Sequence, residues 1–313
     1  MKIAFVFSGQ GSQAPGMGKE LFDNFDICKD IFLKADCVLG YSLSNICFES
    51  EENLNKTQFA QPAIFTMSAA ALALLNEKGI KPVCAAGLSV GEYTALYSAD
   101  AFSFEDGVCL VSARGKLMSE ALPFGFGSMS AILGLDDDLC NKACLQASEG
   151  DDYAVCANFN APGQVVISGR TGAVERAEQK CLEFGAKRAI RLNVQGPFHT
   201  DYLKDASESL KEEINKININ TSLNYPIISN ASGEIDDYKD FANLLALQMV
   251  SSVKWVKSIE TMINMGVDTF IEIGSGKTLC SFIKKINKNV KTLNIEDLAS
   301  FEKCINKLTN QDR

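Results

Sequence analysis

The sequence predicts an α/β protein, a parallel-sheet domain with a second, smaller β-α-β-β-α-β unit inserted in mid-chain. A buried apolar strand and a glycine-rich turn open the chain, and strand-like and helix-like segments alternate along most of it. The segments between residues 125 and 197 follow the split βαβ order of a ferredoxin-like unit. A chain of 313 residues can bury about three quarters of its unfolded surface, so it needs no metal or disulfide for stability.

The N-terminal part supplies the first strand and the first helices. Ile3–Phe7 is a short apolar run that ends at Ser8-Gly9-Gln10-Gly11, as is typical of a buried strand entering a turn. Helical periodicity covers Gly18–Val38 and Ala60–Lys78, and Gly79 is a suitable C-cap for the second helix.

The next segments complete the first half of the parent domain. Val83–Ala86 predicts a very short strand, which is followed by a turn over Gly87–Gly91 and a helix that runs to Ala99. Ser103-Phe104-Glu105-Asp106 resembles a capping box and predicts a helix that extends to about Ala121.

We expect the small unit to occupy residues 125–197, and residues 1–124 and 198–313 to form the large one. The small unit consists of strand Ser128–Leu133, helix Asp136–Glu149, strand Tyr153–Phe159, strand Gln164–Ser168, helix Thr171–Phe184 and strand Arg188–Leu192. The large unit resumes with helix Tyr202–Lys216, a strand near Ile227–Ser229, the amphipathic helix Trp255–Met265 and strand Thr269–Ile273, after which strand and helix alternate again.

Composition excludes several classes of protein. The chain has 30 basic and 39 acidic side chains and a net charge of -9, which argues against nucleic-acid binding. It has no run of about 18 consecutive apolar residues and no signal peptide, so we expect neither a membrane span nor secretion. The eleven scattered cysteines indicate reduced thiols and a cytoplasmic location. The single histidine excludes a histidine-rich zinc site, and we expect no metal.

Gly87-x-Ser89-x-Gly91, between a short strand and a helix, matches the nucleophile-elbow pattern. Its glycines permit a sharp turn that exposes the serine Oγ close to a helix N-terminus, whose amides can hold an oxyanion. An ordinary glycine turn is the alternative.

A serine nucleophile needs a base, and His199 is the only imidazole in the chain. It lies in the irregular stretch Asn193–His199, and catalytic groups are often carried by loops on a rigid scaffold. A solvent-facing or hydrogen-bonded loop histidine is equally compatible with this pattern.

Arg114 lies within a continuous apolar arc of its helix, between Leu110 and Leu117 on one side and Val111 and Met118 on the other. Such an arginine is costly unless it meets an anion. The anion could be an internal Asp or Glu, or the side chain could extend to water. The functional alternative is a guanidinium that binds a substrate carboxylate.

Two further motifs do not meet their requirements. Gly9-x-Gly11-x-x-Ala14 matches a dinucleotide fingerprint, but Pro15-Gly16 interrupts the helix that should follow, and no second strand ends in Asp or Glu about 20 residues later. Gly276-Lys277-Thr278 resembles part of a phosphate loop, but Ile271 occupies the position of its first glycine.

Several motifs together resemble those of the malonyl-CoA:acyl-carrier-protein transacylases, in the family's order and over essentially the whole chain. They are Phe7-Ser8-Gly9-Gln10-Gly11-Ser12-Gln13, Gly87-Leu88-Ser89-Val90-Gly91-Glu92, Arg114-Gly115, Asn158-Phe159-Asn160-Ala161-Pro162-Gly163-Gln164-Val165-Val166-Ile167-Ser168-Gly169, Gly196-Pro197-Phe198-His199, Gln248 before Val253-Lys254-Trp255, and Glu272-Ile273-Gly274-Ser275-Gly276-Lys277.

The resemblance implies an α/β-hydrolase-like catalytic subdomain with a ferredoxin-like insertion. It also implies ping-pong transfer of a malonyl group from malonyl-CoA to the phosphopantetheine thiol of acyl carrier protein, which supplies fatty-acid chain elongation. On this basis CoA and phosphopantetheine enter as substrates, no resident cofactor is needed and the carrier protein binds transiently. Separately from the resemblance, which does not reveal the oligomeric state, we expect a monomer.

The resemblance also assigns the residues of the reaction. Ser89 would attack the thioester after His199 removes its proton, and the backbone carbonyl of Gln248 would orient the His199 ring. The backbone amides of Gln10 and Val90 would hold the oxyanion.

Two further residues would select the substrate. Arg114 would bind the malonyl carboxylate bidentately, and Phe198 would narrow the pocket against branched acyl groups. Leu88 departs from the histidine that the family very often has beside the nucleophile, which leaves the pair of Ser89 and His199 intact.

The main alternative is a serine hydrolase or thioesterase that acts on acyl thioesters, and Arg114 argues against neutral acyl groups. An inactive scaffold protein would be expected to lack Ser89, His199 or Arg114, and all three are present. Because CoA and carrier proteins are anionic, an acidic enzyme needs a local basic patch to attract them. The candidates are Lys187, Arg188 and Arg191, with a second group at Lys277, Lys284 and Lys285; scattered solvated charges are the alternative.

Overall fold

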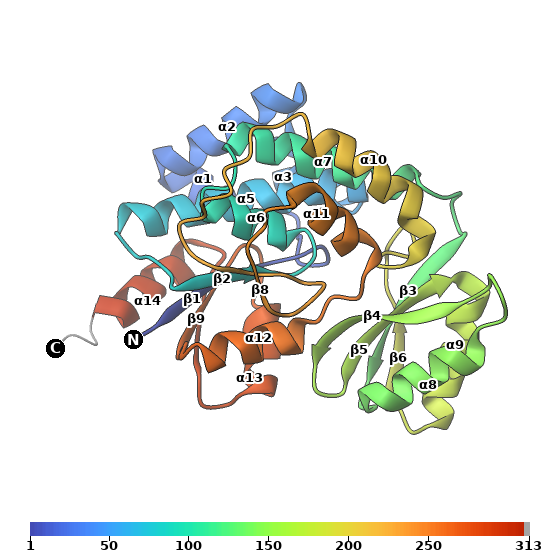
Figure 1. Cartoon of the computed structure of the whole chain (residues 1–313). Coiled ribbons are helices and arrows are strands. Elements are labelled where there is room, and N and C mark those ends of the chain that lie inside the picture. Colours follow the sequence, from blue (N-terminus) through green and yellow to red (C-terminus); the bar gives the residue numbers. More distant parts are fainter. Residues whose placement is uncertain (310–313) are drawn as a thin grey trace.

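The computed structural model describes residues 1–309 and contains two separate sheets (Figure 1). The large sheet has the spatial order β10 (Lys291–Ile295), β9 (Thr269–Ile273), β1 (Ile3–Phe7), β2 (Cys84–Gly87), β7 (Ile227–Ile228) and β8 (Ile235–Asp236). Neighbouring strands from β10 to β7 are parallel, and only the edge strand β8 pairs antiparallel. The predicted parallel α/β sheet is therefore confirmed.

The large sheet is buried on both faces. Phe5 and Phe7 of β1 point into one hydrophobic cluster, and Ala4 and Val6 point into another. This explains why the strand is a continuous apolar run without alternation. The first cluster includes side chains of α1 (Lys19–Asn24), α2 (Asp26–Leu39), α3 (Leu43–Glu49), α4 (Glu51–Leu54), α5 (Thr57–Glu77), α6 (Gly91–Ser98), α7 (Phe104–Glu120), α10 (Lys204–Ile214), α11 (Phe241–Val250) and α14 (Leu298–Thr309). The second includes α12 (Trp255–Asn264) and α13 (Thr278–Ile286).

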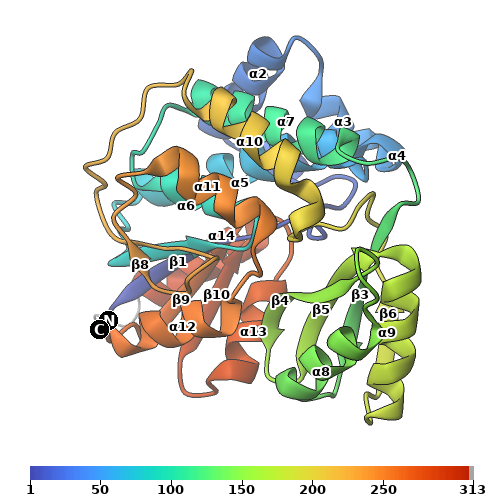
Figure 2. The same ribbon diagram turned by 45° about the vertical axis from the view of Figure 1, so that its right-hand side comes forward.

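The small sheet is antiparallel and has the order β4-β5-β3-β6. Its elements in chain order are β3 (Gly127–Leu133), α8 (Asp137–Ala147), β4 (Ala154–Ala161), β5 (Gln164–Arg170), α9 (Thr171–Glu183) and β6 (Arg188–Arg191). This βαββαβ order, with the first and third strands in the centre, is the arrangement expected of a ferredoxin-like unit. Helices α8 and α9 pack on the side of this sheet that faces away from the large sheet (Figure 2).

Some predicted elements differ from the structure. The single helix expected over residues 18–38 is two helices, because Phe25 adopts an extended backbone (φ -134°) between α1 and α2. The helix expected from Tyr202 begins with a 3-10 turn over Asp201–Leu203 before α10. We did not predict the short α3 and α4, nor α11, whose residues are apolar on nearly all sides and so show no helical periodicity.

Helix α5 has the length and hydropathy of a membrane span, although polar residues interrupt it, so that its apolar runs stay far shorter than the roughly 18 residues of a span. It lies in the protein core, where 83% of its most apolar window is buried. The bent pair of α2 and α3 meets the same criteria only when counted as one segment. A helix that is apolar on nearly all sides is expected in the core of a large protein, and α5 occupies such a position.

Candidate active site

The turn after β2 holds Ser89 in a strained conformation. Its φ is +53°, a left-handed value that is uncommon for residues other than glycine. A Cβ at Gly87 would lie 1.9 Å from the carbonyl of Gly91, and a Cβ at Gly91 would lie 2.3 Å from the carbonyl oxygen of Phe7. Both glycines are therefore required by the close approach of the backbone, which confirms the predicted sharp turn.

His199 meets this serine from the loop that follows the small unit. Its Nε2 lies 2.9 Å from Ser89 Oγ, and its Nδ1 lies 3.0 Å from the carbonyl oxygen of Gln248 and 3.1 Å from that of Ser251. Two carbonyl acceptors fix the proton on Nδ1 and leave Nε2 free to accept the serine proton. Burial, with a smaller effect of the Arg114 charge, lowers the pKa of His199 to about 4, so the ring is neutral at pH 7.

Arg114 of α7 is fully buried beside the nucleophile. Its Nη2 donates to Ser89 Oγ (3.2 Å) and to Gln248 Oε1 (3.0 Å), and its Nη1 donates to Gln61 Oε1 (2.8 Å). Its guanidinium also lies over the Tyr93 ring. Within residues 1–309 no carboxylate lies within 4.0 Å of it, and its Nε has no partner. The side chain therefore does not extend to water and makes no direct ion pair within residues 1–309, although the Glu92 carboxyl, which shares Gln248 with it, still acts on its charge.

Gln248 connects these groups through both its backbone and its side chain. In addition to its contacts with His199 and Arg114, its Nε2 donates to the carbonyl oxygen of Ser89 (2.7 Å) and to Glu92 Oε2 (3.3 Å). Since the amide donates on one side and accepts on the other, these contacts determine which way it faces.

Asn230 and Glu92 support the turn that carries Ser89, and we predicted neither of these roles. Asn230 Oδ1 accepts from the Ser89 N–H (2.7 Å), its Nδ2 donates to the Gly87 carbonyl (2.7 Å), and its own N–H donates to Glu92 Oε2 (2.9 Å). Glu92 Oε1 accepts from the Tyr238 hydroxyl (2.6 Å). Asn230 follows β7, and a polar residue after a strand beside β2 is the signal that could have identified it.

Burial affects the titration of the Glu92 carboxyl. It raises the pKa of Glu92 to about 7, while hydrogen bonds from Tyr238, Asn230 and Gln248 and the Arg114 charge act in the opposite direction. The carboxyl is thus held by three donors in a site where its charge is costly.

The pocket in front of Ser89 has a volume of about 250 Å³ and lies between the two sheets. The large unit contributes Ser8, Gly9, Gln10, Gly11, Ser12, Leu88, Ser89, Met118, Phe198, His199, Glu272, Thr278, Leu279 and Phe282, and the small unit contributes Met129, Ala131, Asn158, Asn160, Gln164, Val166, Leu192 and Val194. Within the part of the chain that the structure describes, the buried Asn160 Oδ1 has no hydrogen-bond partner.

The remaining predicted site residues are Gln10, Phe198 and Val90. Gln10 and the buried Phe198 line the pocket. Val90 follows the nucleophile at the start of α6, and within residues 1–309 the N–H groups of Gln10 and Val90 donate to no protein acceptor. Two free donors close to a serine nucleophile are what an oxyanion hole requires.

The predicted basic patch is not one cluster. Arg188 pairs with Leu133 of β3, which also pairs with the pocket residue Gln164, so Arg188 lies on the pocket side of the small sheet. Arg191 lies on the opposite face, where its guanidinium is 3.0 Å from Glu178 of α9. Lys187 is exposed and packs against Gly134.

The second group of basic residues is also divided. Lys285 donates to Gln164 (2.9 Å), whereas Lys284 donates to the backbone carbonyls of Lys288 and Val290, in the segment that follows its helix. Lys277 is exposed immediately before α13, close to the pocket residue Thr278. Among the described residues, no group of three or more His, Cys, Asp or Glu side chains is arranged to hold a metal ion.

Comparison with known proteins agrees with this geometry. The acyl transferase domain profile matches residues 4–308. The malonyl CoA-acyl carrier protein transacylase of Bacillus subtilis is 44% identical over 313 residues, which cover 99% of this chain and 98% of that protein. The chain belongs to this family of acyltransferases.

Solved structures of the family superpose closely on this chain. The transacylase from Clostridium perfringens is 46% identical with a TM-score of 0.95, and the match covers 100% of this chain and 98% of that one. The one from Streptococcus pneumoniae is 41% identical with a TM-score of 0.93, over 98% and 100% of the two chains. A malonyl-transacylase in complex with a type II PKS acyl-carrier protein is 37% identical with a TM-score of 0.94, over 99% and 100%.

Proposed function

We propose that this enzyme transfers the malonyl group from malonyl-CoA to the phosphopantetheine thiol of acyl carrier protein through a malonyl-Ser89 intermediate. The family shown above supports the overall reaction, and the distances around Ser89 support the two-step route. The observation that carries the proposal is the buried guanidinium of Arg114, which lies 3.2 Å from the nucleophile and has no carboxylate partner within the described residues.

In the first step Ser89 Oγ attacks the thioester carbonyl of malonyl-CoA while His199 Nε2 takes its proton. The N–H groups of Gln10 and Val90 stabilise the oxyanion of the tetrahedral intermediate. The C–S bond then breaks, and His199 returns the proton to the departing CoA thiolate. The carbonyls of Gln248 and Ser251 hold the ring in the tautomer that both transfers need.

In the second step the phosphopantetheine thiol of the carrier protein gives its proton to His199 and attacks the malonyl ester. Collapse of this intermediate breaks the ester bond, and the proton passes to Ser89 Oγ. The reaction consumes one thioester and forms another, so it needs neither a redox change nor a resident cofactor.

Arg114 provides the selectivity for malonyl groups. In the substrate-free structure its guanidinium donates to the amide oxygens of Gln61 and Gln248 and also contacts Ser89 Oγ. A malonyl carboxylate that takes the place of one of these amide oxygens binds the guanidinium while the acyl group lies at the serine. A buried guanidinium that has no directly bonded carboxylate is stabilised much more by the carboxylate of a malonyl group than by a neutral acyl group. Phe198 borders the same pocket and limits its width.

The intact mass of the protein after incubation with malonyl-CoA tests the proposal. We expect a malonyl-sized increment in the wild type, none in Ser89→Ala, and loss of the increment when carrier protein bearing phosphopantetheine is added. Steady release of free malonate without an increment would instead indicate a hydrolase.

We further propose that the enzyme is a cytoplasmic monomer that supplies fatty-acid chain elongation. Eleven free cysteines support a reducing compartment. Arg188 and Lys285 are the basic residues best placed to attract anionic CoA and carrier protein, since both adjoin the row of the small sheet that contains Gln164.

A further inference from the structure

The loop that carries His199 borders open space on two sides. The substrate pocket lies on one side, and a second cavity of about 310 Å³ lies on the other, lined by His199, Thr200, Asp201, Tyr153, Val155, Ala231, Val250, Ser251, Ser252 and Lys254. His199 also has a left-handed backbone, with φ at +61°. Relaxation of the loop would relieve this strain, so contacts elsewhere must hold the loop in place.

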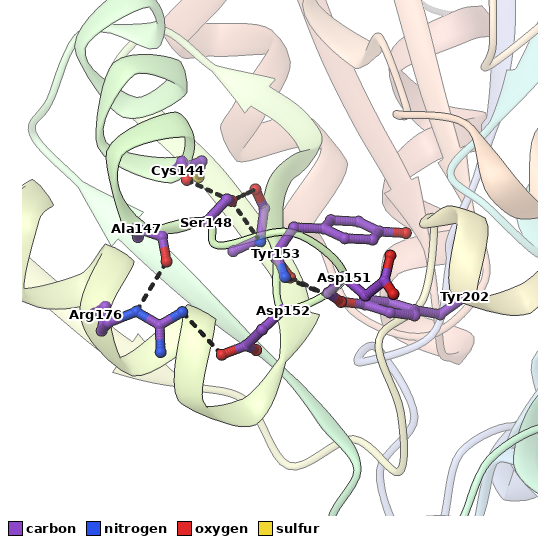
Figure 3. A network of polar contacts seen from close by, with 9 residues as sticks. Cys144, Ala147, Ser148, Asp151, Asp152, Tyr153, Arg176 and Tyr202 are labelled. Atoms are coloured by element: carbon purple, nitrogen blue, oxygen red, sulfur yellow. Dashed lines mark hydrogen bonds and ion pairs between the residues drawn. The ribbon is translucent and has the colours of Figure 1, made fainter.

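Tyr202, three residues after His199, provides such contacts. Its ring stacks on that of Tyr153, with centroids 4.2 Å apart and an interplanar angle of 10°, and it meets the edge of Phe126 at 5.2 Å. Its hydroxyl donates to the carbonyl of Asp151 and accepts from the Tyr153 N–H at 3.0 Å (Figure 3). Every one of these partners belongs to the small unit, whereas His199 serves the nucleophile of the large one.

The turn that receives Tyr202 is itself braced. The carboxylate of Asp152 pairs with Arg176 of α9 at 2.9 Å, and Arg176 Nε donates to the carbonyl of Ala147 at the end of α8 (Figure 3). The hydroxyl of Ser148 accepts from the Ala154 N–H and donates to the carbonyl of Cys144. The turn thus has partners on both helices of the small unit, which gives Tyr202 a fixed anchor.

A second connection reaches the same strand from the segment that orients the His199 ring. Just after Ser251, Ser252 Oγ donates to the carbonyl of Cys156, and Val253 exchanges backbone hydrogen bonds with Ala157 and Phe159. Tyr153, just before strand β4, therefore holds the histidine loop, and the middle of β4 holds Ser252 and Val253, which follow the ring-orienting Ser251.

We propose that Tyr202 is a positioning residue that anchors the His199 loop to the small unit and so sets the distance between His199 Nε2 and Ser89 Oγ. The inference rests on the transfer reaction proposed above. Because a displacement of about 1 Å at a reacting group can cost roughly 100-fold in rate, loss of this anchor affects the chemical step. It leaves malonyl binding unchanged, because Tyr202 contacts neither Arg114 nor the substrate pocket.

The test compares Tyr202→Ala and Tyr202→Phe with the matched variants Tyr225→Ala and Tyr225→Phe. Tyr225 is also partly buried and also donates to a backbone carbonyl, that of Ser98, but it lies outside the substrate pocket. Rapid quench and intact mass give the rate constant of malonyl-enzyme formation and the half-saturating malonyl-CoA concentration. All measurements are made well below the midpoint of thermal unfolding of each variant.

We expect the rate constant to fall about 10- to 100-fold in Tyr202→Ala, with half-saturation unchanged. It should fall by a smaller factor in Tyr202→Phe, which keeps the ring stack, and stay at the wild-type value in both Tyr225 variants. A wild-type rate constant in folded Tyr202→Ala would overturn the inference. If that variant does not fold, a wild-type rate constant in Tyr202→Phe overturns it instead.

A separate outcome concerns the proposed function. If wild-type protein forms no malonyl-enzyme, the proposed reaction has failed, and the rate of Ser89 modification by phenylmethanesulfonyl fluoride then replaces acylation as the readout. The inference predicts slower modification in the Tyr202 variants than in the Tyr225 variants. Equal rates would contradict it.

Discussion

Ser89, His199 and Arg114 meet within hydrogen-bonding distance although each is costly to place where it lies. Ser89 and His199 both have positive φ angles, and Arg114 is a buried cation whose partners are neutral amides. Backbone strain and buried charge of this kind are retained where the chemistry uses them. The free-energy cost of burying the Arg114 charge is offset when a substrate carboxylate binds to it. The same buried charge therefore explains the selectivity for malonyl groups.

Arg114→Ala should change substrate preference more than it changes the serine chemistry. Charged hydrogen bonds contribute about 1.5–3 kcal/mol each, so kcat/KM with malonyl-CoA should fall at least about 10- to 100-fold. Transfer from acetyl-CoA, which has no carboxylate to bind, should change much less. Competition between the two thioesters, followed by the mass of the acylated protein, measures the ratio; an unchanged preference would contradict the carboxylate-binding role.

The depressed pKa of His199 predicts activity at acid pH. The ring must be neutral to accept the serine proton, and with a pKa of about 4 it stays neutral through pH 5, where an ordinary imidazole of pKa 6.5 is mostly protonated. The rate of malonyl-enzyme formation should therefore not follow a titration centred at pH 6.5. Because the pKa of Glu92 is raised to about 7, Glu92→Gln is the control that removes this nearby titration. A loss of rate centred near pH 6.5 in this variant would contradict the prediction.

Some residues of the site were predictable and others were not. Ser89 and Arg114 have local signals, a glycine pattern and a charge within an apolar arc, and the only histidine needs no pattern at all. Gln61 and Glu92 give no such signal, because amides and single carboxylates are common on surfaces, and the only signal of Asn230 is its place after strand β7. Only folding brings Asn230 within 2.7 Å of the Ser89 N–H, which is 141 residues away along the chain.

At the scale of elements, the β2–α6 turn is maintained by groups from other parts of the chain. Asn230 joins both sides of the turn through Ser89 and Gly87, and Gln248 holds the Ser89 carbonyl. The turn therefore depends on side chains placed after β7 and in α11, neither of which is adjacent to it in sequence. This dependence explains how the left-handed Ser89 persists.

Asn230→Ala should reduce both stability and catalysis. It removes the hydrogen bonds to the half-buried Ser89 N–H and to the buried Gly87 carbonyl, at a cost of about 1–3 kcal/mol in the free energy of unfolding. The rate of malonyl-enzyme formation should fall as well, because Ser89 is free to leave its strained conformation. Asn220→Ala is the matched control, since Asn220 also bridges a backbone N–H and a carbonyl but is exposed. Equal losses in the two variants, by denaturant titration and rapid quench, would contradict a special role for Asn230.

The elements themselves were largely predictable, and the errors have local causes. Strands β1 and β9 coincide with the predictions because β1 is an apolar run that ends at a glycine-containing turn and β9 is a mainly apolar segment that ends at Gly274. The break at Phe25 was missed because an aromatic residue ends the helix by its backbone conformation and not by a glycine or proline signal. Helix α11 was missed because its residues are apolar on nearly all sides, so that the helix lacks a polar face.

At the scale of the whole molecule, the active site belongs to both units. Ser89 and Arg114 come from the large one, Asn160 and Val166 from the small one, and the His199 loop connects them. The order of the predicted elements indicated the two units. It did not indicate how the two sheets are placed relative to each other, because that depends on contacts between residues far apart in the sequence. The boundaries expected at residues 124/125 and 197/198 stay a prediction, although they fall in the connections on either side of the small sheet.

The position of Arg188 on the pocket side predicts a role in attracting the carrier protein. Arg188→Ala should raise KM for the carrier protein several-fold at low salt, and the effect should shrink as salt screens the charges. Arg191→Ala removes the same charge from the opposite face and should leave this KM unchanged. Equal KM values for the two variants at low salt would contradict the assignment.

The most direct test of the central claim is the fate of isolated malonyl-Ser89 enzyme. We predict that the purified intermediate persists in buffer and loses its malonyl group rapidly when carrier protein with free phosphopantetheine thiol is added, with the mass increment appearing on the carrier protein. Decay at the same rate with and without carrier protein, with release of free malonate, would contradict transfer and identify the enzyme as a hydrolase.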